Sequence, residues 1–167
     1  QEIPVRLRLS ITHIDRDWAI WFGDDGTSGV YLQPWLPFWP DAATLRPGDQ
    51  VEVEGVSVVG SINPWVKPSR IRPLGVHKPA APRHVALVRR PPVDLDGQLV
   101  ELDVTVQSSR WELGHRYLDA FAPMPISIVI PESGMREIPA TWPGGRVRVR
   151  GVLGLNLDPR SDSFSIT

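Results

Sequence analysis

The chain contains one strand-like segment twice, and this repeat constrains the fold more than any other feature. The first copy, "PGDQVEVEGV", begins at Pro47, and the second, "PGGRVRVRGV", begins at Pro143. In both copies valine alternates with a charged residue, which is the period of two expected of a strand with one buried face. Pro-Gly ahead of each copy favours a tight turn into the strand. The repeat therefore predicts two units of similar fold.

A second pair of segments keeps nearly the same spacing. "PVRLRLSIT" begins at Pro4 and "LVELDVTVQS" at Leu99, and each alternates aliphatic with polar side chains. The 167 residues are enough for two small domains that each bury a core. The 18 prolines, the 14 glycines and the lack of a sustained helical period favour many short strands joined by turns. The expected fold class is all-β.

Each half of the chain contains five strand-like stretches. They are expected near 5–13, 17–24, 28–33, 50–57 and 66–74, and again near 98–108, 115–122, 125–131, 145–153 and 161–167. A longer connection between the third and fourth stretches is the plan of an OB-fold, a small Greek-key barrel. The sequence thus predicts two tandem OB-fold-like five-stranded barrels. Barrel 1 would span 1–76, a Pro-rich linker 77–97 and barrel 2 98–167.

The outward side chains of the repeated strand differ in sign between the two copies. Glu52 and Glu54 occupy the first copy, and Arg148 and Arg150 occupy the second. One explanation is that two solvated faces happen to carry opposite charge, since exposed charges contribute little to stability. The other is that these faces meet each other or a partner.

The first half resembles the tandem OB-fold region found outside the membrane in a group of bacterial sensor histidine kinases. The matching stretches are "ITHIDRDWAIWFGDDGTSGVYL" from Ile11, "LRPGDQVEVEGV" from Leu45 and "GSINPWVKPSRIRPLG" from Gly60. The resemblance covers residues 4–76 and is looser in the second half, where it depends on "GQLVELDVTV" and "PGGRVRVRGVLGLN".

This resemblance implies a non-catalytic extracytoplasmic, periplasmic sensor module of a two-component signal-transduction protein. The module would bind a small ligand or a protein partner, with a homodimer as one arrangement. It would meet the membrane only through a flanking helix outside these residues. The sequence contains neither a phosphoacceptor histidine box nor a Gly-rich nucleotide-binding region, so the segment is not expected to be an enzyme.

Ligands of OB-folds generally bind on the face of strands two and three, between neighbouring loops. If Ile20, Phe22, Val30 and Leu32 fill the barrel, Trp21 and Tyr31 project outward and Trp65 closes over them. The predicted ligand- or partner-binding residues are therefore Trp21, Tyr31, Trp65, Asn63 and Asp17. Trp35, Phe38 and Trp39, in the connection after the third strand, are interpreted as a plug for the barrel.

Two alternatives to the sensor module remain at this point. The same aromatic residues suit single-stranded nucleic-acid binding, which combines stacking platforms with a basic groove. The net charge of −1 and the nearby residues Asp15, Asp17, Asp24 and Asp25 weigh against phosphates, so nucleic acid is not the favoured partner. The third reading is a structural spacer or dimerisation module.

The polar residues indicate no cofactor or metal. Aspartate beside glycine in "DDGTSG" is typical of turns and lacks the ligand spacing of a calcium-binding EF-hand loop. The four histidines fall at no ligand spacing, and there is no cysteine. No nucleophile motif is present either.

Overall fold

The computed structural model describes residues 2–33, 43–60, 62–86, 93–131, 139, 142–158 and 161–166. It divides into two compact units, residues 1–81 and 82–167. Within the described residues there is no α-helix, only strands and the short 3₁₀ turn η2, Val93–Leu95. No helix in this part of the chain has the length and apolar character that crossing a membrane requires.

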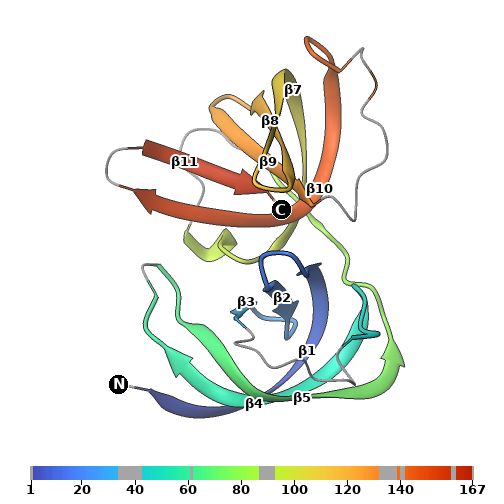
Figure 1. The fold of residues 1–167 in the computed structure, drawn as a ribbon, viewed down its shortest axis with the longest axis vertical. Helices are drawn as coiled ribbons and strands as arrows, with labels where there is room; N and C mark the ends of the chain where they lie inside the picture. Colours follow the sequence, from blue (N-terminus) through green and yellow to red (C-terminus); the bar gives the residue numbers. More distant parts are fainter. Residues whose placement is uncertain are drawn as a thin grey trace. The chain divides into compact units, whose positions relative to one another are not determined.

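The first unit consists of five strands. They are β1 (Ile3–Asp15), β2 (Ile20–Asp24), β3 (Gly29–Leu32), β4 (Asp49–Val58) and β5 (Trp65–His77). The strands close into a barrel in the order β1-β2-β3-β5-β4. The long strands β4 and β5 lie side by side as a strongly curved antiparallel pair (Figure 1).

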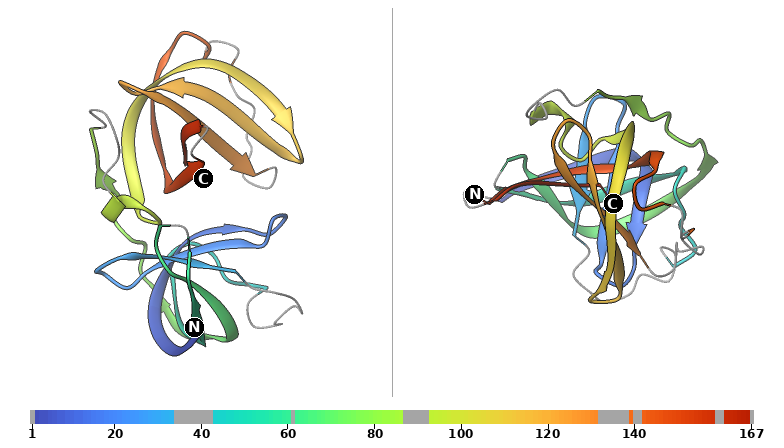
Figure 2. Two further views of the ribbon diagram at one scale, coloured as in Figure 1. Left: turned by 90° about the vertical axis from the view of Figure 1, so that its left-hand side faces the viewer. Right: turned by 90° about the horizontal axis from the view of Figure 1, so that it is seen from above.

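The second unit repeats this order of pairing. Its strands are β6 (Arg83–His84), β7 (Leu99–Glu112), β8 (His115–Phe121), β9 (Pro125–Pro131), β10 (Arg146–Asp158) and β11 (Ser161–Ile166). They form a sheet in the order β10-β11-β9-β8-β7-β6, and β10 also pairs with β7. Apart from β6, the neighbours of each strand therefore correspond to those in the first unit. Figure 2 shows the bend of β7 and the hairpins that follow it.

Each of the ten strands predicted from the sequence is present, with ends shifted by at most a few residues. The boundary between the two units, after Ala81, falls within residues 77–97, which were predicted as a linker. Those up to Ala81 group with the first unit, whereas β6 and η2 belong to the second. The predicted plug residues Trp35, Phe38 and Trp39 lie outside the described residues.

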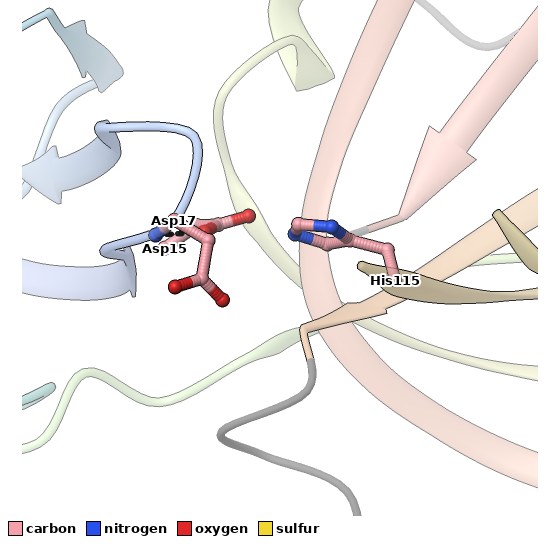
Figure 3. Close-up of side chains that lie close together, drawn as sticks. All are labelled: Asp15, Asp17 and His115. Carbon is pink, nitrogen blue, oxygen red and sulfur yellow. Dashed lines mark hydrogen bonds between the residues drawn. The ribbon is translucent and has the colours of Figure 1, made fainter. Parts of the chain in front are cut away.

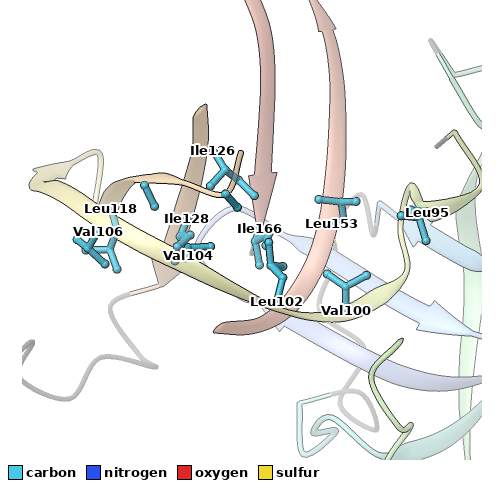
Figure 4. Packing of buried hydrophobic residues seen from close by; sticks show 12 residues of the cluster. Leu95, Val100, Leu102, Val104, Val106, Leu118, Ile126, Ile128, Leu153 and Ile166 are labelled. Carbon is cyan, nitrogen blue, oxygen red and sulfur yellow. The ribbon is translucent and has the colours of Figure 1, made fainter. Parts of the chain in front are cut away.

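The core of the second unit follows the predicted alternation. Val100, Leu102, Val104 and Val106 of β7 are buried and pack with Leu118, Ile126 and Ile128 (Figure 4). Every second residue of β7 therefore faces the interior, as a period of two requires. This burial of aliphatic surface supplies the main stabilising term of the unit.

The core of the first unit also forms around alternating aliphatic residues. Its buried members are Leu9, Ile11, Trp21, Leu32, Leu45, Val51, Val53, Val66 and Ile71. The presence of Trp21 in this cluster corrects the sequence analysis, which placed Trp21 on the outer face and Phe22 inside.

Close packing explains why β2 buries this face. Gly23 shares the inward face with Trp21, and a Cβ at Gly23 would lie 3.0 Å from the Cβ of Leu9. The inward face of β2 therefore carries one large ring, that of Trp21, and no side chain at Gly23. This face fits the narrow space beside β1. Both faces of β2 are apolar in sequence, so alternation alone could not choose between them.

Glycine in the repeated strand has a steric role. At Gly55 the partner strand approaches so closely that an added Cβ would overlap the carbonyl oxygen of Lys67. The β4–β5 register also shifts at this point, between Glu54 and Gly55. Such close approach of two backbones at an irregularity is a typical reason for glycine within a strand.

We expect Gly55→Ala to destabilise the first unit by about 2 kcal/mol or more, because backbone and not a flexible side chain must move. Gly26→Ala is the matched control: Gly26 has a φ of 91° but nothing within 4 Å of an added Cβ. Its cost should be limited to backbone strain of about 1–2 kcal/mol. Urea unfolding of both variants checks the order, and an equal loss would contradict the steric account.

Candidate functional site

Four rings form a row across the outer face of the first barrel. The ring centroids of Phe22 and Tyr31 are 5.3 Å apart, and those of Tyr31 and Trp65 are 6.2 Å apart. The His13 ring lies 6.4 Å from Phe22 at the other end. We call His13, Phe22, Tyr31 and Trp65 the aromatic row.

Strand pairing sets the order of the rings. His13 of β1 is opposite Phe22 of β2, and Phe22 is opposite Tyr31 of β3. The parallel pairing of Leu32 with Val66 then brings β5, and with it Trp65, beside Tyr31. Residues directly opposite on neighbouring strands have side chains within contact distance on the same face. The row therefore crosses four neighbouring strands, β1, β2, β3 and β5.

All four rings are half-buried, and their mutual tilts run from 36° to 55°. Burial raises the pKa of the Tyr31 phenol, so the hydroxyl stays protonated at neutral pH. The row thus combines ring faces, suited to stacking on flat partners, with polar groups that donate hydrogen bonds.

The sequence analysis identified part of this row. Tyr31 and Trp65 project as expected and contact each other. Trp21, only 6% exposed, lies in the core, and Phe22 takes the place predicted for it. Phe22 and His13 were missed as site residues because the face of β2 was assigned the wrong way round.

Asn63 and Asp17, the other two predicted residues, lie in loops. Asn63 is half-buried in the β4–β5 loop, where its carbonyl approaches Gly60 too closely for a Cβ there. Asp17 is exposed in the β1–β2 turn, and its amide donates to Asp15 Oδ1 at 2.9 Å (Figure 3).

The acidic residues of the first unit build its turns. Asp15 Oδ1 also accepts from the Trp18 amide, at 3.0 Å. Asp25 Oδ1 accepts from the amide and hydroxyl of Thr27, and mainly the hydroxyl lowers the pKa of the Asp25 carboxyl. These bonds confirm the turn interpretation of the aspartates. The lowered pKa keeps the Asp25 carboxylate ionised, so its negative charge stays in place beside the turn.

On the outer face of β1, β4 and β5, side chains of opposite charge lie opposite one another on neighbouring strands. Glu52 of β4 pairs in register with Arg8 of β1 and Arg72 of β5. Arg72 Nη2 lies 2.6 Å from Glu52 Oε1, Arg6 Nη2 lies 2.9 Å from the same oxygen, and Arg8 Nε lies 3.7 Å from Oε2. Three guanidinium groups therefore surround one carboxylate.

Two further cations on this face have no such partner. Lys67 and Arg70 of β5 are exposed and make no ion pair with any residue that the structure describes. Lys67 is two residues after Trp65 on the same strand, and Arg70 is opposite Glu54. We call Lys67, Arg70 and Arg72 the basic strip. It continues the outer face of β5 away from the aromatic row.

The second unit uses the same arrangement with the signs exchanged. Arg148 Nε of β10 lies 2.9 Å from Asp103 Oδ1 of β7, and Arg146 Nη2 lies 3.1 Å from Asp103 Oδ2. Both arginines lower the pKa of the Asp103 carboxyl, chiefly through the Arg148 hydrogen bond. The acidic and basic copies of the repeated strand are thus each matched by a neighbour within their own unit.

No family model and no curated protein matches the chain. Among solved structures, it is similar to a murine DNA binding protein bound with double-stranded DNA, with 8% identity, 97% of this chain and 90% of that chain covered, and a TM-score of 0.47. It is also similar to the p204 HINb domain, with 10% identity, coverage of 99% and 93%, and a TM-score of 0.44. The tetrameric p202 HIN2 gives 12% identity, coverage of 99% and 88%, and a TM-score of 0.42.

These matches contradict two expectations from the sequence. The expected function was a sensor module of a histidine kinase, and nucleic acid was not the favoured partner, whereas the first matching structure is described as a DNA binding protein, which agrees better with the nucleic-acid-binding alternative. We therefore do not carry the sensor assignment further.

We expect Trp21→Ala to lower the free energy of unfolding by about 3–5 kcal/mol, since a buried indole leaves a cavity. Trp65→Ala, in the half-buried aromatic row, should cost only about 1 kcal/mol. Urea denaturation followed by circular dichroism measures both. Equal losses would mean that Trp21 is not a core residue.

The arginines around Glu52 predict a pH dependence of stability. Hydrogen bonds from Arg6 and then Arg72 lower the pKa of the Glu52 carboxyl from 4.5 to about 2. Because the folded-state pKa is depressed, the stabilisation is present above the unfolded value and is lost as pH falls from about 4.5 to about 2. Unfolding free energy should therefore decline less steeply over this range in Glu52→Gln than in wild type. Identical slopes in Glu52→Gln and wild type would refute the role of Glu52.

Proposed function

We propose that the chain is a tandem pair of OB-fold-like barrels and that the first binds single-stranded nucleic acid. Binding occurs on the outer face that carries the aromatic row and the basic strip. The observation that carries the proposal is the contact series His13, Phe22, Tyr31, Trp65, followed on β5 by the unpaired cations Lys67 and Arg70.

The strand order supports the barrel assignment. In the first unit the pairing runs β1-β2-β3-β5-β4, and in the second β7, β8, β9, β11 and β10 pair in the corresponding order. This is the order of an OB-fold, whose second and third strands form the usual ligand face. The aromatic row crosses that face in the first unit, at β2 and β3.

Stacking supplies the first half of the interaction. Every base has a flat π-face, so aromatic side chains on a barrel surface bind single strands with little sequence preference, at about 1–3 kcal/mol per base. Tyr31 and Trp65, joined by a ring contact, offer neighbouring platforms for successive bases. In a duplex the bases are stacked on one another and their faces are inaccessible, so this contact favours single strands.

A modest electrostatic attraction to phosphates supplies the second part of the interaction. Lys67 and Arg70 make no ion pair with any described residue, although Arg70 lies opposite Glu54, so their exposed charges can displace counterions from phosphates. Arg72 is tied to Glu52 but its side chain is still 49% exposed. With a net charge of −1 overall, the attraction is local, and the affinity should depend only modestly on salt.

The test is a fluorescence-anisotropy titration of a labelled single-stranded oligonucleotide of about 12 nucleotides at low salt, a length within the usual site sizes. Tyr31→Ala and Trp65→Ala should each weaken binding by roughly 5- to 150-fold, equivalent to about 1–3 kcal/mol. Trp111→Ala is the matched control, because Trp111 is an exposed tryptophan of the second unit. It should bind as wild type does.

Lys67→Gln should weaken binding for a different reason. Loss of one phosphate contact reduces the slope of log K against log salt by about 0.7 for a single strand. Unchanged affinity in Trp65→Ala, or tighter binding of a duplex than of the single strand, would overturn the proposal. In the duplex case the interface would be one of backbone contacts without stacking.

A further inference from the structure

A cavity of about 550 Å³ lies on the first unit, and no residue of the aromatic row is among its lining residues. One wall is the outer part of β1, with Arg8 and Ser10. The opposite walls are the β2–β3 turn, with Asp24 and Asp25, and residues 78–81, which follow β5 and are called the strap here. The volume suits a small organic molecule and far exceeds that of an inorganic anion.

Two hydrogen bonds hold the strap against the barrel. Ser10 Oγ donates to the Lys78 carbonyl at 2.9 Å, and the Lys78 amide donates to the Gly48 carbonyl at 2.7 Å. The backbone of Lys78 is therefore fixed at both its polar groups. Its side chain is one of those that line the cavity.

On one side of the cavity, hydrogen-bond donors outnumber acceptors. The Lys78 ammonium and the Gln50 amide make no side-chain bond with any residue in the described part of the chain. Arg8 joins them, since its guanidinium is 78% exposed and lies 3.7 Å from Glu52, beyond hydrogen-bonding distance. Two cations and an amide thus line the same cavity, Arg8 through an ion pair with Glu52 that leaves most of its side chain exposed, and such donors suit an anionic oxygen group such as phosphate.

The other side of the cavity offers acceptors. Asp24 accepts one hydrogen bond from the Gly26 amide, and Asp25 Oδ1 accepts those of the following turn. An ionised carboxylate has about four acceptor positions, so each retains capacity for a ligand donor. Carboxylates repel phosphate but accept from hydroxyl and amino groups, and they would therefore orient a ligand with an anionic end and a donor-bearing end.

An apolar stretch connects the two sides. Leu9, Leu74, Pro79 and Ala80 contribute to the lining between the donor and acceptor groups. A flat, weakly polar body can lie against such a surface. A nucleotide combines all three properties: a phosphate, hydroxyl and amino donors, and a flat base.

We propose that this cavity binds the phosphomonoester of a nucleotide, with Lys78, Arg8 and Gln50 on the phosphate and the aspartates on the nucleoside. The nucleotide is either free or the terminal residue of a strand. The proposal that the site binds the end of a strand rests on the proposed function. Arg8, Glu52 and Arg72 lie opposite one another on β1, β4 and β5, and this series of side chains connects the basic strip to the cavity.

The experiment compares oligonucleotides that carry a 5′-phosphate, a 3′-phosphate or neither, together with a free nucleoside monophosphate, by titration calorimetry. Wild type should bind one phosphorylated end about tenfold more tightly than the unphosphorylated strand, which corresponds to about 1.4 kcal/mol. Lys78→Gln should lose this preference and keep the affinity for the unphosphorylated strand, and Lys78→Arg should restore it. Lys67→Gln, the charge-matched control, should weaken all strands and keep the preference.

The outcomes separate the two proposals. If no strand binds but the monophosphate binds in a Lys78-dependent way, the cavity is a free-nucleotide site and the proposed function fails. If unphosphorylated strands bind but neither a terminal phosphate nor a monophosphate depends on Lys78, the cavity proposal is overturned and the proposed function stands. Equal thermal midpoints for wild type and the two Lys78 variants would exclude misfolding as the cause, because Lys78 is exposed.

Discussion

The packing of Gly23 against Leu9 determines which face of β2 is buried, and the surface of the first barrel depends on it. With no side chain at Gly23, β2 lies close to β1, and Trp21 fills the interior beside it. Phe22 is then forced outward, opposite His13 and Tyr31. A slip of one residue would exchange the two faces of the strand and remove the aromatic row.

Strand pairing also determines which charged side chains lie next to one another on the outer faces. In the first unit the strand of alternating valine and glutamate lies between two strands that carry arginine, and in the second unit the arginines of β10 pair in register with the acidic strand β7. The pairing neutralises most of the charge within each unit. What remains on the first unit is a small excess of cations on β5, next to Trp65.

This surplus and the aromatic row together give the proposed nucleic-acid surface its character. In the proposed complex the rings would provide the larger part of the binding energy, and the cations would orient the strand along β5. Since three arginines are already engaged by Glu52, the surface does not resemble a polycationic groove. An interface of this kind is compatible with a chain whose net charge is −1.

The sequence by itself determined the approximate places of ten strands, though not β6 or the exact strand ends, because alternation, Pro-Gly turns and the internal repeat are local signals. It also indicated Tyr31, which alternates with the aliphatic residues Val30 and Leu32, and Trp65, which lies in the segment "NPWV". Only the tertiary structure decided between Trp21 and Phe22, since both faces of β2 are apolar and the choice depends on the space beside Leu9. The Glu52 cluster and the Lys78 cavity likewise required the fold, because they join residues of β1, β4, β5 and the strap that lie far apart along the chain.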